Sequence, residues 1–213
     1  MKKIVLCCAL LAGVISYSFI NSSSKNKWIA LFDGHSLNGW KVGDNAESFT
    51  VDSGWIMVKG KTAHLYYDGP VKDHNFKNFE FKADVMTRPG ANSGIYFHTA
   101  YQQGGWPEKG YEVQVNNSQS DWRRTGSLYN IKDIKEVYVK DGEWFTESFV
   151  VKGKHVTISI NGKEVVDYTE PENVERGKGQ EQRKISSGTF ALQAHDPNSI
   201  IYFRNIMVKP LKD

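Results

Sequence analysis

Cysteine is nearly absent from this sequence of 213 residues, and its two cysteines, Cys7 and Cys8, both lie close to the N-terminus. If that segment is removed during export, the mature chain has no thiol. Disulfides, cysteine nucleophiles and zinc–thiolate sites are then excluded. A chain of this length can instead be stabilised by the burial of apolar surface.

The sequence also lacks a strong excess of either charge. It has 27 Lys and Arg against 24 Asp and Glu, and loss of Lys2 and Lys3 with a leader would leave 25 against 24. This balance gives no indication of nucleic acid as a partner. A mean hydropathy of -0.50 with 39% hydrophobic residues is typical of a water-soluble domain with a core.

Long apolar runs are missing except at the N-terminus. Residues 4–15 form one after Lys2 and Lys3, but twelve residues are too few to span a bilayer comfortably. Ser16-Tyr17-Ser18 then fits a small-x-small cleavage site. We predict a signal peptide over 1–18, a polar tether over 19–27, and an exported mature chain, periplasmic or at the cell surface, with no membrane insertion. A retained anchor is the alternative.

Helical periodicity is also absent after the leader. Apolar and polar residues alternate in short segments, as in half-buried strands, at 79–85, 93–98, 111–115 and 199–208. Asn161-Gly162 lies between two more such segments and favours a type I′ hairpin turn. These patterns predict a single all-β domain over 28–213, a sandwich or a barrel.

The alternation predicts which side chains point away from the core. If Ile95, Val113 and Leu192 face inward, their neighbours share the outer face of one sheet. That face would carry Tyr96, His98, Glu112, Gln114, Asn116, Gln193 and His195. Amides and carboxylates bind sugar hydroxyls and aromatic rings stack on pyranoses, so we interpret the face as a carbohydrate groove. An ordinary wetted sheet surface is the alternative.

Other candidates lie at turns and in loops. Gly94 inside a strand indicates either a close approach of ligand or chain, or a bulge. Asn92 lies at the preceding turn, and Trp106 in a glycine-rich loop is predicted to stack on sugar or to pin that loop. Trp122, with two arginines after it, is a second loop candidate. The charged segment 170–184 is predicted to be a solvated insertion, with a lid as the alternative.

Several segments resemble, in order, the bacterial 3-keto-disaccharide hydrolase family. They are residues 28–40, 88–97, 110–115, 125–129, 188–196 and 202–206, which cover nearly the whole mature chain. The resemblance implies a concanavalin A-like jelly roll, a two-sheet antiparallel β-sandwich, that cleaves glycosides already oxidised at C3. The chain departs from the family at His98, where arginine is often expected, and in the longer segment before Gly188.

The number of predicted carboxylates fits cleavage of a 3-keto glycoside better than it fits conventional glycoside hydrolysis. Conventional glycosidases use two carboxylates, whereas the central strand predicted here offers only Glu112, with Asp121 or Asp196 as a second that the sequence cannot place. A C3 ketone instead acidifies the hydrogen at C2, so one base can start an elimination. We predict Glu112 as base or acid, and His98 and His195 as enolate partner or proton donor.

Besides the two-carboxylate hydrolase, two alternatives stay open at this stage. His98, Glu112 and His195 together have the ligand types of a divalent metal site, although they come from separate strands without a spacing motif. A lectin-like module that binds glycan without chemistry is the second. The other histidines, His64 among them, are predicted to be surface residues.

Overall fold

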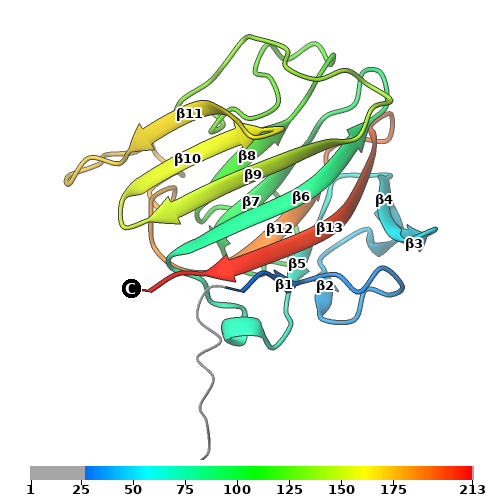
Figure 1. Cartoon of the computed structure of the whole chain (residues 1–213), viewed down its shortest axis with the longest axis horizontal. Coiled ribbons are helices and arrows are strands. Elements are labelled where there is room, and N and C mark those ends of the chain that lie inside the picture. The colour runs from blue at the N-terminus through cyan, green and yellow to red at the C-terminus, as the bar shows by residue number, and fades with distance from the viewer. Residues whose placement is uncertain (1–26, 213) are drawn as a thin grey trace, which may run out of the picture.

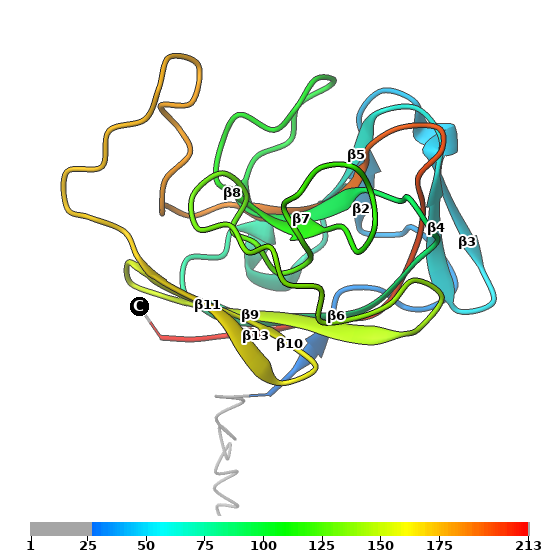
Figure 2. The same cartoon turned by 90° about the horizontal axis from the view of Figure 1, so that it is seen from above.

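The computed structural model describes residues 27–212, so the predicted signal peptide and almost all of the tether lie outside the described residues. The chain forms two antiparallel sheets packed face to face, which confirms the predicted all-β sandwich (Figures 1 and 2). Within these residues only two short 3-10 segments interrupt the strands, η1 (Ala46–Ser48) and η2 (Val71–His74). None of the described helices is long and apolar enough to cross a membrane.

The larger sheet has eight strands in the order β11-β10-β9-β6-β13-β4-β3, with β1 paired to β13. Its strands are β1 (Ile29–Ala30), β3 (Phe49–Asp52), β4 (Trp55–Lys59), β6 (Phe79–Thr87), β9 (Phe145–Lys152), β10 (His155–Ile160), β11 (Lys163–Thr169) and β13 (Ile200–Pro210). Asn161 and Gly162 join β10 to β11 with φ of 50° and 78°, as the predicted type I′ turn requires.

The smaller sheet has five strands in the order β2-β5-β12-β7-β8. They are β2 (Trp40–Val42), β5 (Ala63–Tyr67), β7 (Ser93–Thr99), β8 (Tyr111–Val115) and β12 (Thr189–Ala194). Every residue of β5, β7, β8 and β12 is buried. Figure 2 shows why: long loops fold over the outer side of this sheet. The alternative of a wetted sheet surface is therefore wrong.

Aromatic side chains fill the space between the sheets. The Phe190 ring on β12 lies 4.7 Å from the rings of Phe76 and Phe81 and 4.9 Å from that of Phe79. Phe81 also stacks on Phe149 at 4.8 Å. Each such side chain contributes about 1.5–3 kcal/mol when fully buried, so this cluster fixes the smaller sheet against the larger one.

Candidate functional site

A cavity of about 320 Å³ lies on the outer side of the smaller sheet. Its floor consists of polar side chains from β7, β8 and β12, and its walls come from the loops around them. The lining residues are Asn92, Tyr96, Trp106, Pro107, Glu108, Glu112, Gln114, Tyr129, Gly179, Gln180, Arg183, Gln193 and His195. The predicted catalytic and substrate-binding residues other than His98 and Asn116 are thus brought together, in a walled pocket rather than an open groove, while the loop candidate Trp122 lies outside the lining.

Glu112 is the best-anchored carboxyl group of the floor. Tyr96 lies opposite it in the β7–β8 register, and the Tyr96 hydroxyl donates to Glu112 Oε2 at 2.9 Å. Gln193 Nε2, from β12, donates to Glu112 Oε1 at 3.1 Å and to the Tyr96 hydroxyl at 2.9 Å. Three neighbouring strands therefore hold one carboxyl group in a single orientation.

Burial tunes this carboxyl group for proton transfer. Desolvation raises the pKa of Glu112 to about 7, although hydrogen bonds from Tyr96 and Gln193 and the charge of Arg183 oppose the shift. A nearby Asp121 adds a smaller upward effect. A group with this pKa gives and takes protons readily near neutral pH.

The amides of the floor leave acceptors free for a ligand. Gln114 Nε2 donates to Asn92 Oδ1 at 3.2 Å, and the Asn92 backbone N–H donates to Ser199 Oγ at 2.9 Å. Within residues 27–212, the buried Oε1 atoms of Gln114 and Gln193 have no hydrogen-bond partner. Unsatisfied acceptors in a polar pocket suit a ligand rich in hydroxyl groups.

The segment 170–188 forms one wall of the cavity. It contributes Gly179, Gln180 and Arg183, and Arg183 Nη2 donates to the Tyr129 carbonyl at 2.6 Å. The prediction of an exposed loop holds for most of 171–184, while Gln180 and Arg183 are partly buried at the cavity, as the alternative of a cover requires. Sequence reasoning missed Arg183 because no strand periodicity extends into this segment.

A buried polar network holds the base of that cover. The hydroxyl of Tyr111 donates to Glu170, and Ile185 N–H donates to the same carboxylate at 2.9 Å. Arg176 donates to the hydroxyls of Tyr111 and Tyr168 and lies 3.8 Å from the Glu170 carboxylate. Tyr111 precedes Glu112 on β8, so the network ties the cover to the strand that carries the central carboxyl group.

Trp106 also lines the cavity. Its ring lies 5.4 Å from the His195 ring and 5.7 Å from that of His64, with half of its surface exposed. His195 Nδ1 pairs with Asp196 Oδ2 at 2.8 Å, which leaves its other nitrogen for the cavity. His64 is buried rather than on the surface, because β5 places it opposite Gln193 and under Trp106, and burial lowers its pKa to about 4.

The prediction that His98 shares the outer face is wrong. Its backbone has a φ of 55°, in the left-handed region, so the strand alternation breaks at this residue. Its ring packs edge-on against Phe79 at 5.6 Å. His98 Nε2 lies 2.9 Å from the Lys77 carbonyl, and Nδ1 accepts from Ser186 N–H. His98 thus ties two loops to the core, and desolvation lowers its pKa to about 4.

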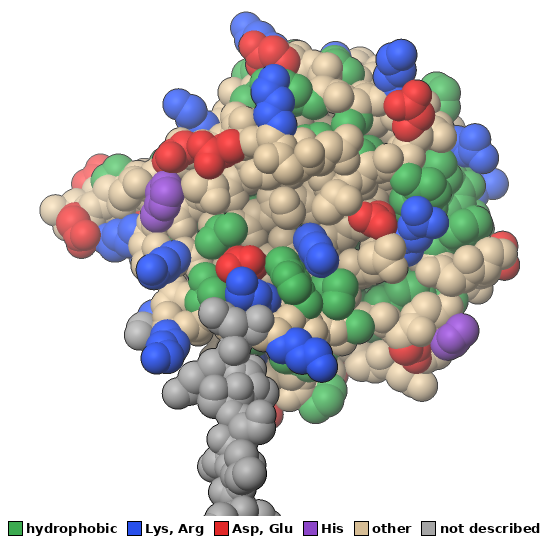
Figure 3. Space-filling model, in the orientation of Figure 1, with side chains coloured by type: hydrophobic (Ala, Val, Ile, Leu, Met, Phe, Trp, Pro, Cys, Tyr) green, Lys and Arg blue, Asp and Glu red, His purple; other side chains and the backbone are tan. Residues whose placement is uncertain are grey.

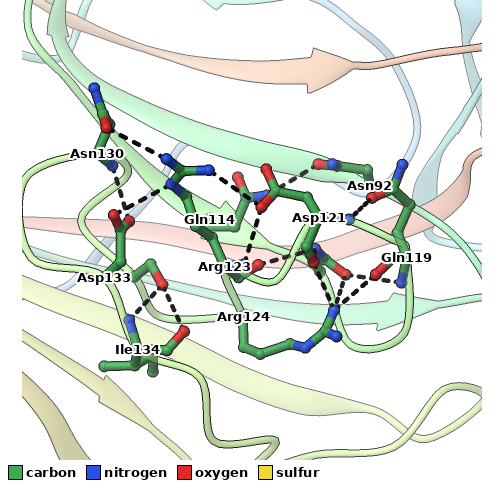
Figure 4. Close-up of polar contacts among 11 residues, drawn as sticks. Asn92, Gln114, Gln119, Asp121, Arg123, Arg124, Asn130, Asp133 and Ile134 are labelled. Carbon is green, nitrogen blue, oxygen red and sulfur yellow. Dashed lines mark hydrogen bonds and ion pairs between the residues drawn. The ribbon is translucent and has the colours of Figure 1, made fainter.

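Asn116 also lies outside the cavity lining. Its Nδ2 donates to the carbonyls of Asp121 and Arg123 at 2.8 and 2.9 Å, and its Oδ1 accepts from Gln119 and Arg124. Figure 4 shows four of these partners, Gln119, Asp121, Arg123 and Arg124, beside Asn92 and Gln114. Asn116 therefore shapes the loop next to the pocket.

The carboxylates weighed as a second catalytic acid are both occupied elsewhere. Asp121 pairs with Arg123 at 3.3 Å, while Asp196 accepts from His195, Asn198 and Ser199. Among the described residues, the cavity lining contains one carboxyl group besides Glu112, that of the exposed Glu108.

The three residues considered as metal ligands do not come together, because His98 points into the core. Across the part of the chain that the structure describes, no group of three or more His, Cys, Asp or Glu side chains is arranged to hold a metal ion.

Comparison with known proteins decides the family. Residues 27–209 match the family model of the 3-keto-alpha-glucoside-1,2-lyase-like domain. The chain belongs to this family. The predicted resemblance is confirmed over residues 27–209, and with it a carbohydrate-directed activity.

Solved structures share this fold. A candidate glycosyl hydrolase from Parabacteroides distasonis superposes with a TM-score of 0.72 at 24% identity, over 87% of this chain and 94% of that one. The carbohydrate-binding module CBM66 from Bacillus subtilis gives a TM-score of 0.58 at 12% identity, over 80% and 95%. No curated protein matched the sequence.

Proposed function

We propose that this chain cleaves glycosides whose sugar ring is already oxidised to a ketone at C3. The observation that carries the proposal is the pairing of one buried carboxyl group, Glu112, whose pKa is about 7, with one cation, Arg183, in a walled polar pocket. This set suits an elimination, which needs a base, a partner for an enolate oxygen and a proton for the leaving group.

The reaction begins when the Glu112 carboxylate removes the proton at C2, which the C3 ketone acidifies. The electrons of that C–H bond form an enolate, and the Arg183 guanidinium is the group suited to stabilise its oxygen. The enolate then expels the aglycone oxygen from C1, leaving a double bond between C1 and C2 conjugated with the ketone.

The leaving oxygen needs a proton. Protonated Glu112 can return the proton that it took, or His195 can supply one from the Trp106 side of the cavity. Addition of water at C1 afterwards converts the elimination into net hydrolysis. Tyr96 and Gln193 act through Glu112, by holding its carboxyl group in place.

A two-carboxylate hydrolase is the competing function, with Glu108 as the second acid. The two functions need different substrates, and a module that only binds glycan releases no product. Export of the mature chain, expected from residues 1–18, belongs to the proposal as well.

To test this proposal, the purified mature chain is mixed with a 3-keto glucoside and, separately, with its unoxidised parent. Each mixture is prepared with and without a chelator, and release of the aglycone is measured. We expect release from the keto sugar alone, and loss of that release in Glu112→Gln. Loss with chelator would add a metal to the mechanism. Release from the unoxidised parent would instead favour the two-carboxylate function, and Glu108→Gln is then the decisive variant.

A further inference from the structure

Trp122 is a large apolar side chain that remains on the surface near the cavity. It is 45% exposed, although large hydrophobic side chains in the described part of the chain are mostly buried. Trp122 does not line the cavity, so the mechanism above makes no use of it.

A cation links this indole to the cavity wall. The Arg123 guanidinium lies 4.9 Å from the ring centre of Trp122 and 4.9 Å from that of Tyr129. Tyr129 lines the cavity. Tyr129, Arg123 and Trp122 are therefore successive groups leading from the pocket to the surface.

Arg123 is itself held in place. Its Nε and Nη1 lie 3.2 Å from Asp133 and 3.3 Å from Asp121, and Nη2 lies 3.4 Å from the Asn130 side chain. Figure 4 shows the guanidinium between these groups. Lys135 adds a second cation 5.2 Å from the Trp122 ring. The exposed indole is thus pre-organised, which lowers the entropic cost of binding a ring.

The size of the cavity limits how much of a glycoside it holds. At about 320 Å³ it lies near the lower end of ligand pockets, which span roughly 300–1,000 Å³, and suits one sugar ring. The ring that reacts at C1, C2 and C3 must lie at Glu112. The group attached through the C1 oxygen therefore extends beyond the lining.

We propose that Trp122 binds the ring of the aglycone, either a second pyranose or an aromatic ring, and so determines which glycosides are cleaved efficiently. Indole faces bind the C–H face of a pyranose or stack on an aromatic ring. The inference rests on the proposed function, because it needs a glycone at Glu112.

The experiment measures kcat/KM for two keto substrates that share one glycone. One is a methyl 3-keto-glucoside, whose aglycone is too small to reach Trp122, and the other is a 3-keto disaccharide. For Trp122→Ala we expect kcat/KM to fall about tenfold with the disaccharide, and by less than about twofold with the methyl glycoside. Trp122→Phe should restore most of the loss.

Trp144 provides a matched control. It stacks on Arg204 at 3.9 Å and contacts Trp55 on the outer face of the larger sheet, away from the cavity. Trp144→Ala should leave the ratio of the two kcat/KM values unchanged, and Trp106→Ala should lower both values because Trp106 lines the cavity. Equal loss on both substrates in Trp122→Ala, or no loss on either, overturns the aglycone site. If the wild-type chain cleaves neither substrate, the proposed function fails first and the aglycone site with it.

Discussion

The carboxyl group of Glu112 lies directly against the backbone of Gly94. A Cβ atom on Gly94 would lie 2.2 Å from Glu112 Oε1 and 2.7 Å from Glu112 Cγ. No side chain larger than hydrogen fits there while Glu112 keeps its hydrogen bonds to Tyr96 and Gln193. Of the two interpretations of this strand glycine, the close approach of another part of the chain is confirmed.

Gly94→Ala should therefore displace the Glu112 carboxyl group. We expect kcat/KM to fall about 100-fold or more, because small misplacements of a catalytic group are costly. A double-mutant cycle checks the cause: Gly94→Ala should cost markedly less unfolding free energy in a Glu112→Ala background, with a coupling of about 0.5–3 kcal/mol. If Gly94→Ala lowers the free energy of unfolding equally in both backgrounds, the glycine is required by the strand itself and not by the position of Glu112.

The pKa of Glu112 predicts the pH profile. As a base, Glu112 must be ionised, so kcat/KM should fall about tenfold per unit as the pH drops below about 7. Glu112→Gln should lower kcat/KM about 10²–10⁴-fold and should abolish this fall at acid pH, the acid limb of the profile. Tyr96→Phe deletes a donor to the carboxylate, which raises the pKa and should move the limb to higher pH. A limb that stays in place in Tyr96→Phe would assign it to another group.

Arg176 should act on catalysis through Arg183. Loss of the Arg183 charge raises the pKa of Glu112, so Arg183→Gln should lower kcat and move the acid limb upward. Arg176→Ala loosens the cover and should move the limb in the same direction by a smaller amount. The control is Lys178→Ala, which removes an exposed cation of the same segment that does not line the cavity. A loss of activity in Arg176→Ala with an unmoved limb would contradict this positioning role.

Strand alternation predicted the floor of the cavity from the sequence, and the particular residues show where such reasoning stops. Tyr96, Glu112, Gln114 and Gln193 were found because an unbroken strand repeats every two residues. His98 was misplaced because a left-handed φ ends the alternation, and no residue type signals this. Arg183 and the burial of His64 depend on loops that fold over the sheet, and these contacts connect residues far apart in the chain.

The structure predicts that His98 matters for stability and not for chemistry. His98→Gln loses the ring that joins Lys77 to Ser186, and should lower the free energy of unfolding by about 1–3 kcal/mol. Below its melting temperature the variant should keep kcat within a few-fold, whereas His195→Gln should lower kcat at little cost in stability. Thermal denaturation and steady-state kinetics on both variants separate a structural role from a catalytic one. A large loss of kcat in a folded His98→Gln variant would mean that His98 takes part in the reaction.

Glu147 should make stability depend on pH once the pH exceeds the pKa of a glutamate in the unfolded chain. The side chain points from β9 into the core with no exposed surface, and within residues 27–212 neither carboxyl oxygen has a hydrogen-bond partner. Desolvation holds the pKa of Glu147 well above 4.5; the nearby Gly126 backbone N–H opposes this shift, and the charge of Glu112 adds to it. The folded chain therefore keeps a proton that the unfolded chain has released, and the free energy of unfolding falls by about 1.4 kcal/mol per pH unit until the folded group ionises.

The window above about pH 5 isolates this group when the wild type is compared with Glu147→Gln, because Glu112, His64 and His98 titrate in both proteins. Glu147→Gln stays neutral at every pH, so urea unfolding of the variant should show a flatter dependence than that of the wild type across this window. The variant should also be the more stable of the two at pH 9, since it never carries a buried charge. Parallel curves for the two proteins would mean that Glu147 is already ionised in the folded chain.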